Sequence, residues 1–410
     1  MFTVAYLANR FPAAVEPYVG DEIQELRRRG VQVIPSSVRR PDRKLHRSQS
    51  VSQNEILCLQ PIRILTLLRA FTLVLWHWKR IASLISRVIL QGKEPLNRRL
   101  KALVHTGLGA YYAAKLRKHA VNHIHVHHGY FGSWIAMVAS RLLDVSYSVT
   151  LHGSDLLVDG AYLDKKLEYC RFCATISEYN RSHILKHFPV IDPAKVSVLR
   201  LGVDVPECSE PPPAAGGTLN LLAVGRLHAV KDHAFLVRSC ARLRDRGLNF
   251  ECVIAGDGPE RHSLELLIRE NRLETRLALL GYIDRSQMDS LYRRADIVVL
   301  TSRSEGIPLV LMEAMVRNRI VLAPAITGIP EIVIPGKTGF LYRAGALEDF
   351  VEKILFLHRL MRRADSSAVS PLDWIRHAAR VQVLHNFNRS RNLSLFADRF
   401  LQSIATPHSS

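Results

Sequence analysis

The sequence predicts an α/β protein of two Rossmann-like domains, each a doubly wound parallel sheet, facing a central cleft. Three observations support this prediction. The chain has 410 residues, beyond the length at which a single hydrophobic core keeps growing. Short apolar runs alternate with helical patterns in two separate series, and a stretch rich in proline, glycine and alanine divides them. We therefore expect a first domain at 1–207, a hinge at 208–219, a second domain at 220–380, and a final helix at 381–410 that packs back on the first domain.

The first series opens with an apolar run at 2–8, a helix that ends near Gly30 and a second apolar run at 31–38. Within that helix Ile23 and Leu26 stand at helical spacing, and glycine commonly ends a helix. Strand, helix, strand is the usual opening of a parallel, doubly wound sheet. Further strands are expected at 123–128, 146–152, 173–177 and 196–202, and a helix at 133–143.

The second series restarts after the hinge. Apolar runs alternate with two helical patterns that end near Gly247 and Asn271. Ligands of open parallel sheets bind in the crevice beyond the carboxyl ends of the strands. We therefore expect the ligand-binding and catalytic residues at the carboxyl ends of these strands. The runs that predict strands are 220–227, 250–258, 277–283, 295–302 and 320–325.

Net charge is the unusual property of the composition. Lys and Arg number 56 against 37 Asp and Glu, which leaves a formal charge of +19. Such a field attracts nucleic acid, phosphorylated substrates or an anionic membrane surface. The sequence has no nucleic-acid-reading motif and no basic run interleaved with aromatic residues, so no nucleic-acid partner is expected. Phosphates and an anionic membrane surface are the expected partners.

The chain start and the cysteines indicate the compartment. MFTVAYLANRFP lacks the basic region, apolar stretch and small-residue cleavage site of an export signal. The six cysteines are scattered through a chain too large to need disulfides, so a reducing cytoplasm is expected. Cys170 and Cys173 form a C-x-x-C motif. Because no second cysteine pair accompanies it, two buried structural residues are favoured over a redox or metal site.

The segment 56–87 is apolar but is interrupted by Pro61 and four basic residues, so it does not make a convincing membrane span. Two interpretations stay open. It could lie in a membrane interface, with apolar side chains dipping in and cations meeting lipid phosphates, at the inner face of the cytoplasmic membrane. It could instead be a helical excursion packed on the core of the first domain. The four basic residues that interrupt the segment before its last residue, Arg87, are Arg63, Arg69, Lys79 and Arg80.

Residues 304–315, SEGIPLVLMEAM, predict a helix start that can bind an anion. Proline suits the first helical position, which predicts that the helix begins at Pro308. The N–H groups of Gly306, Ile307 and Leu309 are then among those left free at the helix N-terminus, which is a ready anion site.

Two glutamates flank this helix start. Glu305 is expected at the lip of the anion site, and Glu313 about one and a half turns inside the helix. A carboxylate there can accept hydrogen bonds from paired hydroxyl groups such as those of a ribose. The alternative is that these carboxylates only stabilise the helix dipole.

Cations are predicted at the carboxyl end of the first strand of the second domain. The run LLAVGRL leads to Gly225 and Arg226, and Lys231 follows. Arginine grips diphosphate oxygens in a bidentate manner and lysine acts as a point charge, so the two together could hold a diphosphate. The alternative is a pair of solvated loop cations.

A run of histidines in the first half resembles a metal site. His123, His125 and His127 alternate along one expected strand and so share a face, and His128 follows them. No Asp, Glu or Cys accompanies them at ligand spacing. We therefore expect no metal there, and one or two of these histidines, His127 in particular, near an acceptor.

Taken together, the motifs resemble a known family. VGRLHAVKD, IAGDGPER, LLGYI, SEGIPLVLMEAM and GIPEIVIPGKTGFLY occur in the order and spacing of the retaining family-four glycosyltransferases, which have the two-Rossmann GT-B fold. HIHVHHGYFG, YSVTLHGSDLL and ATISEYNR are similar to the branch that builds bacterial exopolysaccharides, including enzymes of the colanic-acid type. The resemblance covers nearly the whole chain.

The resemblance implies a role for each matching residue. His152, in the T-x-H position, would lie beside the transferred sugar. Many relatives carry a glycine pair where this chain has Ala13 and Ala14, which weakens the case for phosphate contacts from that loop. Glu16 is retained from a common S-E-T-F motif and would bind or deprotonate the acceptor. The donor residues implied are Arg226 and Lys231 for the diphosphate, Glu305 for the sugar, Gly306, Ile307, Pro308 and Leu309 for sugar and phosphate, Glu313 for ribose, and Tyr282 and Ile283 beside the base.

The implied activity is that of a retaining, metal-independent hexosyltransferase without a cofactor. It would move a hexose from a UDP- or GDP-sugar to a hydroxyl of a lipid-linked or oligosaccharide acceptor, in exopolysaccharide, capsule or lipopolysaccharide biosynthesis. Two alternatives stay open. One is a nucleotide-sugar epimerase on the same fold, and the other is a non-catalytic, membrane-docked scaffold that binds nucleotide sugars.

Overall fold

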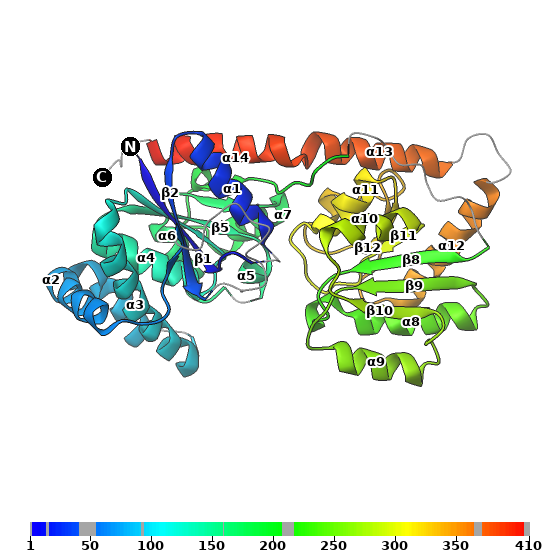
Figure 1. Ribbon diagram of the computed structural model, residues 1–410, viewed down its shortest axis with the longest axis horizontal. Helices are drawn as coiled ribbons and strands as arrows, with labels where there is room; N and C mark the ends of the chain where they lie inside the picture. The colour runs from blue at the N-terminus through cyan, green and yellow to red at the C-terminus, as the bar shows by residue number, and fades with distance from the viewer. Residues whose placement is uncertain are drawn as a thin grey trace. The chain divides into compact units, whose positions relative to one another are not determined.

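The computed structural model describes residues 2–13, 16–40, 55–91, 94–158, 160–206, 217–364 and 371–405. The chain forms two compact units (Figure 1). Unit 1 consists of Met1–Leu199 and Leu393–Ser410, and unit 2 of Arg200–Asn392. The first change of unit thus comes before the predicted boundary at 207. Most of the predicted hinge, 208–219, lies outside the described residues.

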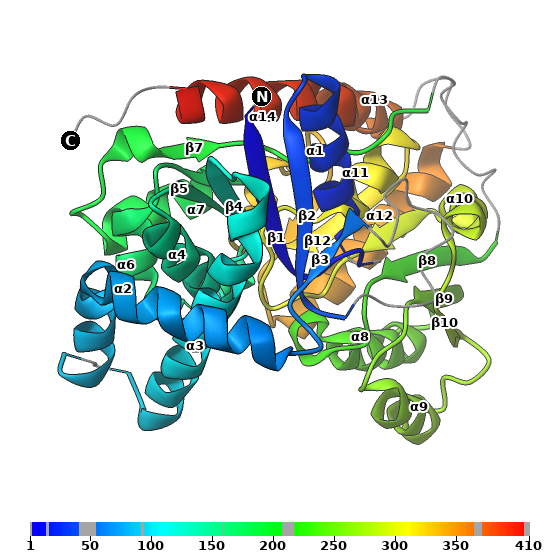
Figure 2. The same ribbon diagram turned by 60° about the vertical axis from the view of Figure 1, so that its left-hand side comes forward.

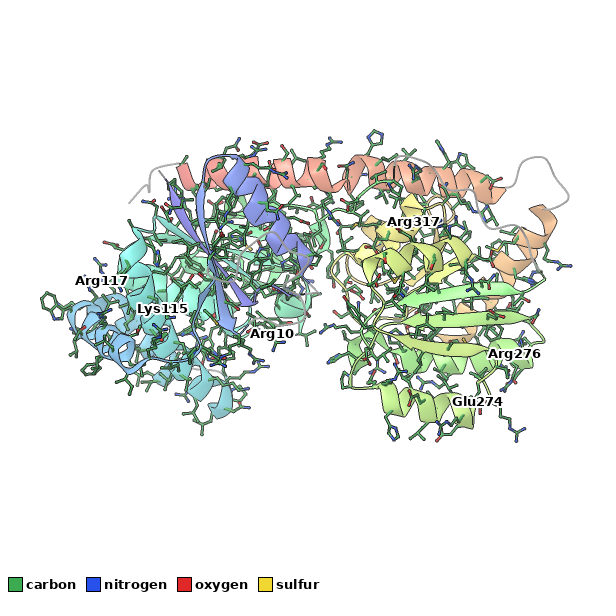
Figure 3. All side chains as sticks on the ribbon, viewed as in Figure 1. Arg10, Lys115, Arg117, Glu274, Arg276 and Arg317 are labelled. Carbon is green, nitrogen blue, oxygen red and sulfur yellow. The ribbon has the colours of Figure 1, made fainter. Side chains whose placement is uncertain are left out.

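Unit 1 is built on a seven-stranded sheet with the order β3-β2-β1-β4-β5-β6-β7, and each neighbouring pair is parallel. The carboxyl ends of the strands therefore meet at one edge, where Figure 3 labels Arg10, the last residue of β1. The strands are β1 (Thr3–Arg10), β2 (Gln32–Arg39), β3 (Leu57–Cys58), β4 (His123–His127), β5 (Ser146–Leu151), β6 (Cys173–Thr175) and β7 (Val196–Val198).

Helices cover both faces of this sheet, as the alternation along β1 shows. Ala5 and Leu7 point into a core shared with helices α2, α3 and α4. Val4 and Tyr6 point to the other face, into a core shared with α1 and the C-terminal helix α14. The helices of this unit are α1 (Pro17–Arg28), α2 (Ile64–Ile89), α3 (Leu96–Leu116), α4 (Phe131–Leu143), α5 (Ser154–Leu157), α6 (Leu163–Tyr169) and α7 (Glu178–His187), joined by α14 (Arg389–Ala405).

Unit 2 repeats the plan with a six-stranded parallel sheet of order β10-β9-β8-β11-β12-β13. Leu221 of β8 joins a core with α8, α9 and α12, whereas Leu222 joins the opposite core with α10, α11 and α13. Its elements are β8 (Leu219–Val224), α8 (His233–Asp245), β9 (Phe250–Ala255), α9 (Arg261–Glu270), β10 (Leu277–Gly281), α10 (Arg285–Arg294), β11 (Ile297–Val299), α11 (Leu309–Val316), β12 (Ile320–Pro324), β13 (Phe340–Tyr342), α12 (Leu347–Ala364) and α13 (Pro371–Asn386).

The predicted fold class, two doubly wound parallel α/β units, is confirmed. The edge strands β3 and β13 were not predicted, and β7 is shorter than the predicted strand at 196–202. At the C-terminal end, residues 381–392 belong to unit 2, and α14 adds Phe396 and Phe400 to the core of unit 1.

The C-x-x-C motif is structural. Cys170 follows the end of α6, Cys173 begins β6, and both are buried free thiols. Burial raises the pKa of the Cys170 thiol to about 12, so it stays protonated and unreactive at neutral pH.

Most of the apolar segment 56–87 is helical and packs on the core of unit 1, as one of the two interpretations predicted. It contains α2, which packs beside α3 and α4 on unit 1 (Figure 2). Helix α2 buries Leu73, Ile81 and Leu84 and kinks at His77. A second stripe of α2, at spacings of three and four residues, stays exposed and apolar. Among the described residues, no helix is long and apolar enough to span a bilayer. The exposed stripe, here called the α2 stripe, consists of Ile64, Leu68, Phe71, Leu75 and Trp78.

Candidate active site

In unit 2, the loops that follow β8 and β11 bring together two residues 74 positions apart. Lys231 ends the short 3-10 helix after β8, and its Nζ donates to Oε1 of Glu305 at 2.5 Å. Ser302 donates to the same carboxylate oxygen at 2.6 Å. The Lys231 and Glu305 side chains are 20% and 12% exposed, so the pair is sheltered yet reachable by a ligand.

Next to this pair, the backbone of the loop after β9 packs closely against the backbone of the loop after β8. A Cβ atom on Gly256, whose φ is +152°, would lie 1.9 Å from the carbonyl oxygen of Gly225. A Cβ atom on Gly258 would lie 2.4 Å from the carbonyl oxygen of Leu227. The glycines of the IAGDG motif therefore let the loop after β9 press on the loop after β8, over which the side chain of Lys231 passes.

Helix α11 begins one residue later than predicted. Leu309 is its first helical residue and Pro308 is the N-cap, with ψ of 121°, because the proline keeps an extended backbone angle at the turn into the helix. The N–H groups of Gly306, Ile307 and Leu309 donate no hydrogen bond within the described residues. Thr327 donates to the carbonyl oxygen of Glu305 at 2.6 Å and so fixes this loop. The N–H groups that the sequence predicted to be free at this helix start are thus free within the described structure, and anion binding there stays a prediction.

Glu313 lies four residues beyond the first residue of α11, about one turn rather than one and a half. Its Oε2 accepts a hydrogen bond of 2.7 Å from the buried hydroxyl of Tyr292 on α10. Arg317, labelled in Figure 3 just beyond α11, donates to the Glu313 carbonyl oxygen and pairs with Asp289. Burial and the Glu313 carboxylate raise the pKa of Tyr292 far above its usual value, so it remains a donor. Glu313 is thus held in one orientation by a neighbour that sequence reasoning missed.

The other predicted donor residues are less tightly placed. Arg226 directly follows the Gly225 turn and is exposed, with no ion pair among the described residues. Tyr282 follows β10 and is 70% exposed, whereas Ile283 packs partly against the core below α10 and α11. No hydrogen bond or ion pair in the described structure links these three residues to the Lys231–Glu305 pair.

In unit 1, a second cluster lies at the carboxyl ends of β4 and β5. His127 ends β4, and His152 follows β5. Nδ1 of His127 lies 2.9 Å from Nε2 of His152, and Nε2 of His127 lies 3.0 Å from Oε2 of Glu22 on α1. Tyr6 also donates to Glu22 and contacts His127. His127 is buried inside this cluster, whereas the sequence placed it against the acceptor.

His128 stands between two carboxylates in the same cluster. Its Nε2 lies 3.0 Å from Oε1 of Glu16, and its Nδ1 lies 3.7 Å from Oδ2 of Asp155. Burial alone would lower the pKa of His128, but these carboxylates raise it to about 10, which makes it an imidazolium at neutral pH. Asp155 also accepts the backbone N–H groups of Gly129 and His152, and its pKa is lowered mainly by His128 against the effect of burial. The predicted acceptor residue Glu16 thus forms part of a fixed charged group.

His152 is half-buried at the surface end of the cluster. Burial, together with the charge of His128, holds the pKa of His152 well below its usual value, so its ring is neutral. The ring of Tyr18 stacks on it at a centroid distance of 4.7 Å. Asp155 stands in the HGSDLL motif and could have been found from sequence. Glu22, Tyr6 and Tyr18 could not, because their contacts with the histidines are tertiary.

The histidine run requires one correction. The sequence suggested that no carboxylate accompanies the histidines, but Glu22 does, and ligand atoms of Glu22, His125 and His127 lie within 4.8 Å of one another. Both ring nitrogens of His125 already have hydrogen-bond partners, Ser148 at 2.7 Å and Thr150 at 3.1 Å. Those bonds favour a hydrogen-bond network over a metal centre.

Comparison with known proteins shows which family most of unit 2 resembles. Residues 206–365 match the family described as Glycosyl transferases group 1. This part of the chain is a group 1 glycosyltransferase domain. It contains every predicted donor residue from Gly225 to Glu313, whereas Glu16, His127 and His152 lie before it.

Relatives of the chain include proteins named for polysaccharide biosynthesis. The chain is 33% identical over 155 residues to alpha-D-kanosaminyltransferase of Streptomyces kanamyceticus, covering 37% of this chain and 40% of that protein. It is 30% identical over 202 residues to the putative colanic acid biosynthesis glycosyltransferase WcaL of Escherichia coli K12, covering 48% of each. It is 28% identical over 250 residues to the amylovoran biosynthesis glycosyltransferase AmsK of Erwinia amylovora, covering 58% of this chain and 61% of that one. The matches thus span about half the length of these relatives.

Solved structures confirm the GT-B fold beyond the group 1 domain. Sucrose-phosphate synthase of Thermosynechococcus elongatus superposes with a TM-score of 0.72 at 17% identity, covering 99% of this chain and all of that one. Anabaena HepE in complex with UDP-glucose superposes with a TM-score of 0.69 at 15% identity, covering 98% of this chain and 100% of that one. At such low identity these likenesses concern the fold alone.

Proposed function

We propose that this protein is a retaining, metal-independent hexosyltransferase that uses a nucleotide diphosphate sugar. The observation that carries the proposal is the Lys231–Glu305 pair beside the free N–H groups that precede α11. A cation and a helix N-terminus attract a diphosphate, and a carboxylate accepts hydrogen bonds from sugar hydroxyls. Anabaena HepE, which shares the fold, was solved with UDP-glucose, which supports this donor class.

In the proposed donor site, each group has a separate task. Arg226 and Lys231 bind the diphosphate, and Glu305 binds the sugar. Glu313, oriented by Tyr292, accepts hydrogen bonds from the ribose through the carboxylate oxygen that Tyr292 leaves free. Tyr282 and Ile283 flank the base, where an exposed ring can stack on it.

The proposed chemistry is electrostatic. The bond between the anomeric carbon and the diphosphate oxygen breaks, and its electron pair leaves with the diphosphate. The acceptor oxygen bonds to the anomeric carbon on the same face, and its proton passes to the departing diphosphate oxygen. Lys231, Arg226 and the N–H groups before α11 stabilise the charge that grows on the diphosphate, and because they are fixed in advance they favour the transition state. These cationic groups supply the charge that a divalent metal would otherwise provide.

Acceptor binding is proposed for unit 1. Glu16 and the neighbouring His128 lie at the carboxyl end of the sheet, where ligands of parallel sheets bind. His152, whose ring centroid lies 4.5 Å from that of His128, is proposed to lie beside the transferred sugar. Relatives named for colanic acid and amylovoran biosynthesis support a saccharide acceptor in exopolysaccharide or lipopolysaccharide assembly. We further propose that this saccharide is lipid-linked.

A lipid-linked acceptor agrees with a peripheral position at the inner face of the cytoplasmic membrane. The α2 stripe exposes aliphatic and aromatic side chains, and Trp76 beside it is 85% exposed. No Asp or Glu occurs from 56 to 93, whereas Arg63, Arg69 and Lys79 lie exposed there. Apolar side chains flanked by cations alone match an anionic lipid surface.

The proposed function is tested by thermal unfolding with UDP, GDP and their sugars, with and without a chelator. A ligand that binds only the folded state at about 100 times its Kd stabilises that state by about 2.7 kcal/mol. We expect a rise in Tm with one nucleotide series that the chelator does not change. Transfer to a saccharide acceptor, with the anomeric configuration read by NMR, then completes the test.

Three results would overturn parts of the proposal. If the sugar of the donor is epimerised and no glycosylated acceptor forms, the protein is an epimerase. Stable binding without turnover of any acceptor would identify a scaffold. Loss of turnover in the chelator would refute metal independence.

A further inference from the structure

A buried line of polar side chains leads from the core of unit 1 to His152. Glu22 is 3% exposed and accepts a hydrogen bond from the hydroxyl of Tyr6. Its Oε2 lies 3.0 Å from Nε2 of His127, and Nδ1 of His127 lies 2.9 Å from Nε2 of His152. Nδ1 of His152 has no hydrogen-bond partner in the described part of the chain. The line thus ends on one ring nitrogen of His152.

The direction of these hydrogen bonds follows from the acceptor at the buried end. A carboxylate accepts and does not donate, so Nε2 of His127 carries the proton of the bond to Glu22. With His127 taken as a neutral imidazole, which has one N–H donor and one acceptor, Nδ1 of His127 is the acceptor. Nε2 of His152 must then donate to it. The remaining nitrogen of His152, Nδ1, carries a lone pair.

We propose that Glu22 and His127 are positioning residues that hold His152 in its Nε2–H tautomer, so that Nδ1 accepts a hydrogen bond from a hydroxyl group of the sugar substrate. The inference rests on the proposed function, in which His152 lies beside the transferred sugar. It replaces the direct acceptor contact predicted for His127 with an indirect role. A carboxylate behind a histidine also sets the tautomer in Ser-His-Asp triads.

The other contacts of His152 hold its ring in position but do not set its tautomer. The tautomer therefore depends on the hydrogen bond with His127. Tyr18 stacks on the His152 ring, and Asp155 accepts the backbone N–H of His152 at 3.0 Å. The His128 ring lies 4.5 Å away between centroids. These contacts fix the place and plane of the ring, but none of them bonds a ring nitrogen of His152.

The test is the tautomer itself, read without catalysis. Histidine-selective ¹⁵N labelling of the full chain and long-range ¹H–¹⁵N correlation distinguish the two tautomers, and a His152→Asn variant assigns the signal. We expect the wild type to show Nε2–H. In Glu22→Gln the amide can donate or accept, and in His127→Gln the contact with His152 is lost, so both should show mixed tautomers. His125→Gln, a buried histidine of the same strand that does not contact His152, should keep Nε2–H.

Kinetics give the second readout. We expect kcat/KM for transfer to fall by about 10- to 100-fold in Glu22→Gln and His127→Gln, the range seen when a metal-binding histidine loses its orienting partner. The rise in Tm with nucleotide alone should persist, since that ligand is bound by unit 2. An Nδ1–H tautomer in the wild type, or wild-type tautomer and kcat/KM in both variants, would overturn the inference. Absence of transfer by the wild type would instead refute the proposed function, because the tautomer is measured independently.

Discussion

Lys231 and Glu305 form an ion pair in which the two charges neutralise each other. A diphosphate that attracts Lys231 would weaken this bond and release the carboxylate towards the sugar, so that donor binding prepares both groups. The pair is sheltered, and in such surroundings electrostatic interactions are stronger than in water.

Removing either member should therefore impair transfer without unfolding the protein. We expect Lys231→Ala and Glu305→Ala to lower kcat by about 100- to 1,000-fold, the usual cost of losing one group that stabilises transition-state charge. Steady-state kinetics with saturating donor, together with circular dichroism, provide the measurement. Lys353→Ala, on α12 of the same unit, is the matched control. Near-normal turnover in both site variants would refute the donor-site assignment.

His128 gives a prediction for pH. Its pKa rises from about 6.5 in the unfolded chain to about 10 in the folded one, so its stabilising effect is complete below pH 6.5 and is lost as the pH rises towards 10. The loss amounts to at most about 1.4 kcal/mol per pH unit.

The comparison protein for this prediction is His128→Asn, because position 128 has a φ of 70° and asparagine tolerates that region. We expect urea unfolding to show the wild type more stable than the variant at pH 6, with the difference shrinking up to pH 10. A difference that stays constant over this range would show that His128 does not titrate as inferred.

Residues of the candidate site were predictable to different degrees. Glu305, Lys231 and His152 could be predicted because each lies within a short sequence motif that resembles a motif of the family. The role of Glu22 could not, since 105 positions separate it from His127 and only the packing of α1 on the sheet joins them. Tyr292, which orients Glu313, stands outside the motifs for the same reason.

At the level of elements, the contact between α3 and α4 depends on one small residue. A Cβ atom on Gly109 of α3 would lie 2.6 Å from Cβ of Val138 on α4 and 3.0 Å from the carbonyl oxygen of Ile135. A Cβ atom on Gly107 of the same helix would meet nothing within 4 Å. The two glycines, two positions apart, therefore offer a matched pair.

We expect Gly109→Ala to destabilise the protein by about 1–3 kcal/mol, since the helices must separate to admit the methyl group. Gly107→Ala should stabilise it by about 0.5–1 kcal/mol, because alanine lowers the entropy cost of an exposed helical position. Urea unfolding measures both. Equal effects of the two substitutions would contradict the observed helix packing.

Longer elements were predicted well because their patterns are strong. The apolar runs of β1 and β8 and the helical spacing in α1 left little choice. Strand β3 has two residues and β13 has three, too few to show a period. They form because neighbouring strands supply hydrogen-bonding partners, a tertiary effect that no local pattern records.

For the molecule as a whole, net charge and the α2 stripe predict the same behaviour. We expect the protein to bind vesicles containing anionic lipid, to bind neutral vesicles weakly, and to be released by salt, since a charge of +19 acts through a screened field. Vesicle cosedimentation at low and high salt measures this.

Variants separate the contribution of the basic residues to membrane binding from that of the exposed apolar side chains. Serine at Arg63, Arg69 and Lys79 should reduce binding to anionic vesicles, and Trp76→Ser with Trp78→Ser should reduce it at every salt concentration. Arg80 is better left intact, because it pairs with Asp144 and donates to the carbonyl oxygen of Leu142. Unchanged vesicle binding in both variants, or a dimer seen by analytical ultracentrifugation that the tryptophan variant abolishes, would assign the stripe to protein contacts instead.

The position of α14 in the chain affects the order in which the two units can finish folding. Phe396, Phe400 and Ile404 complete the core that covers Tyr6 and Ile23 on one face of the first sheet. On the ribosome, the sheet of unit 1 is therefore synthesised before unit 2, yet this face stays open until α14 has emerged. Unit 2, whose residues are continuous in the chain, can finish folding first. Unit 1, whose sheet is translated first, is thus completed after unit 2, when Phe396 and Phe400 of α14 pack against the ring of His125.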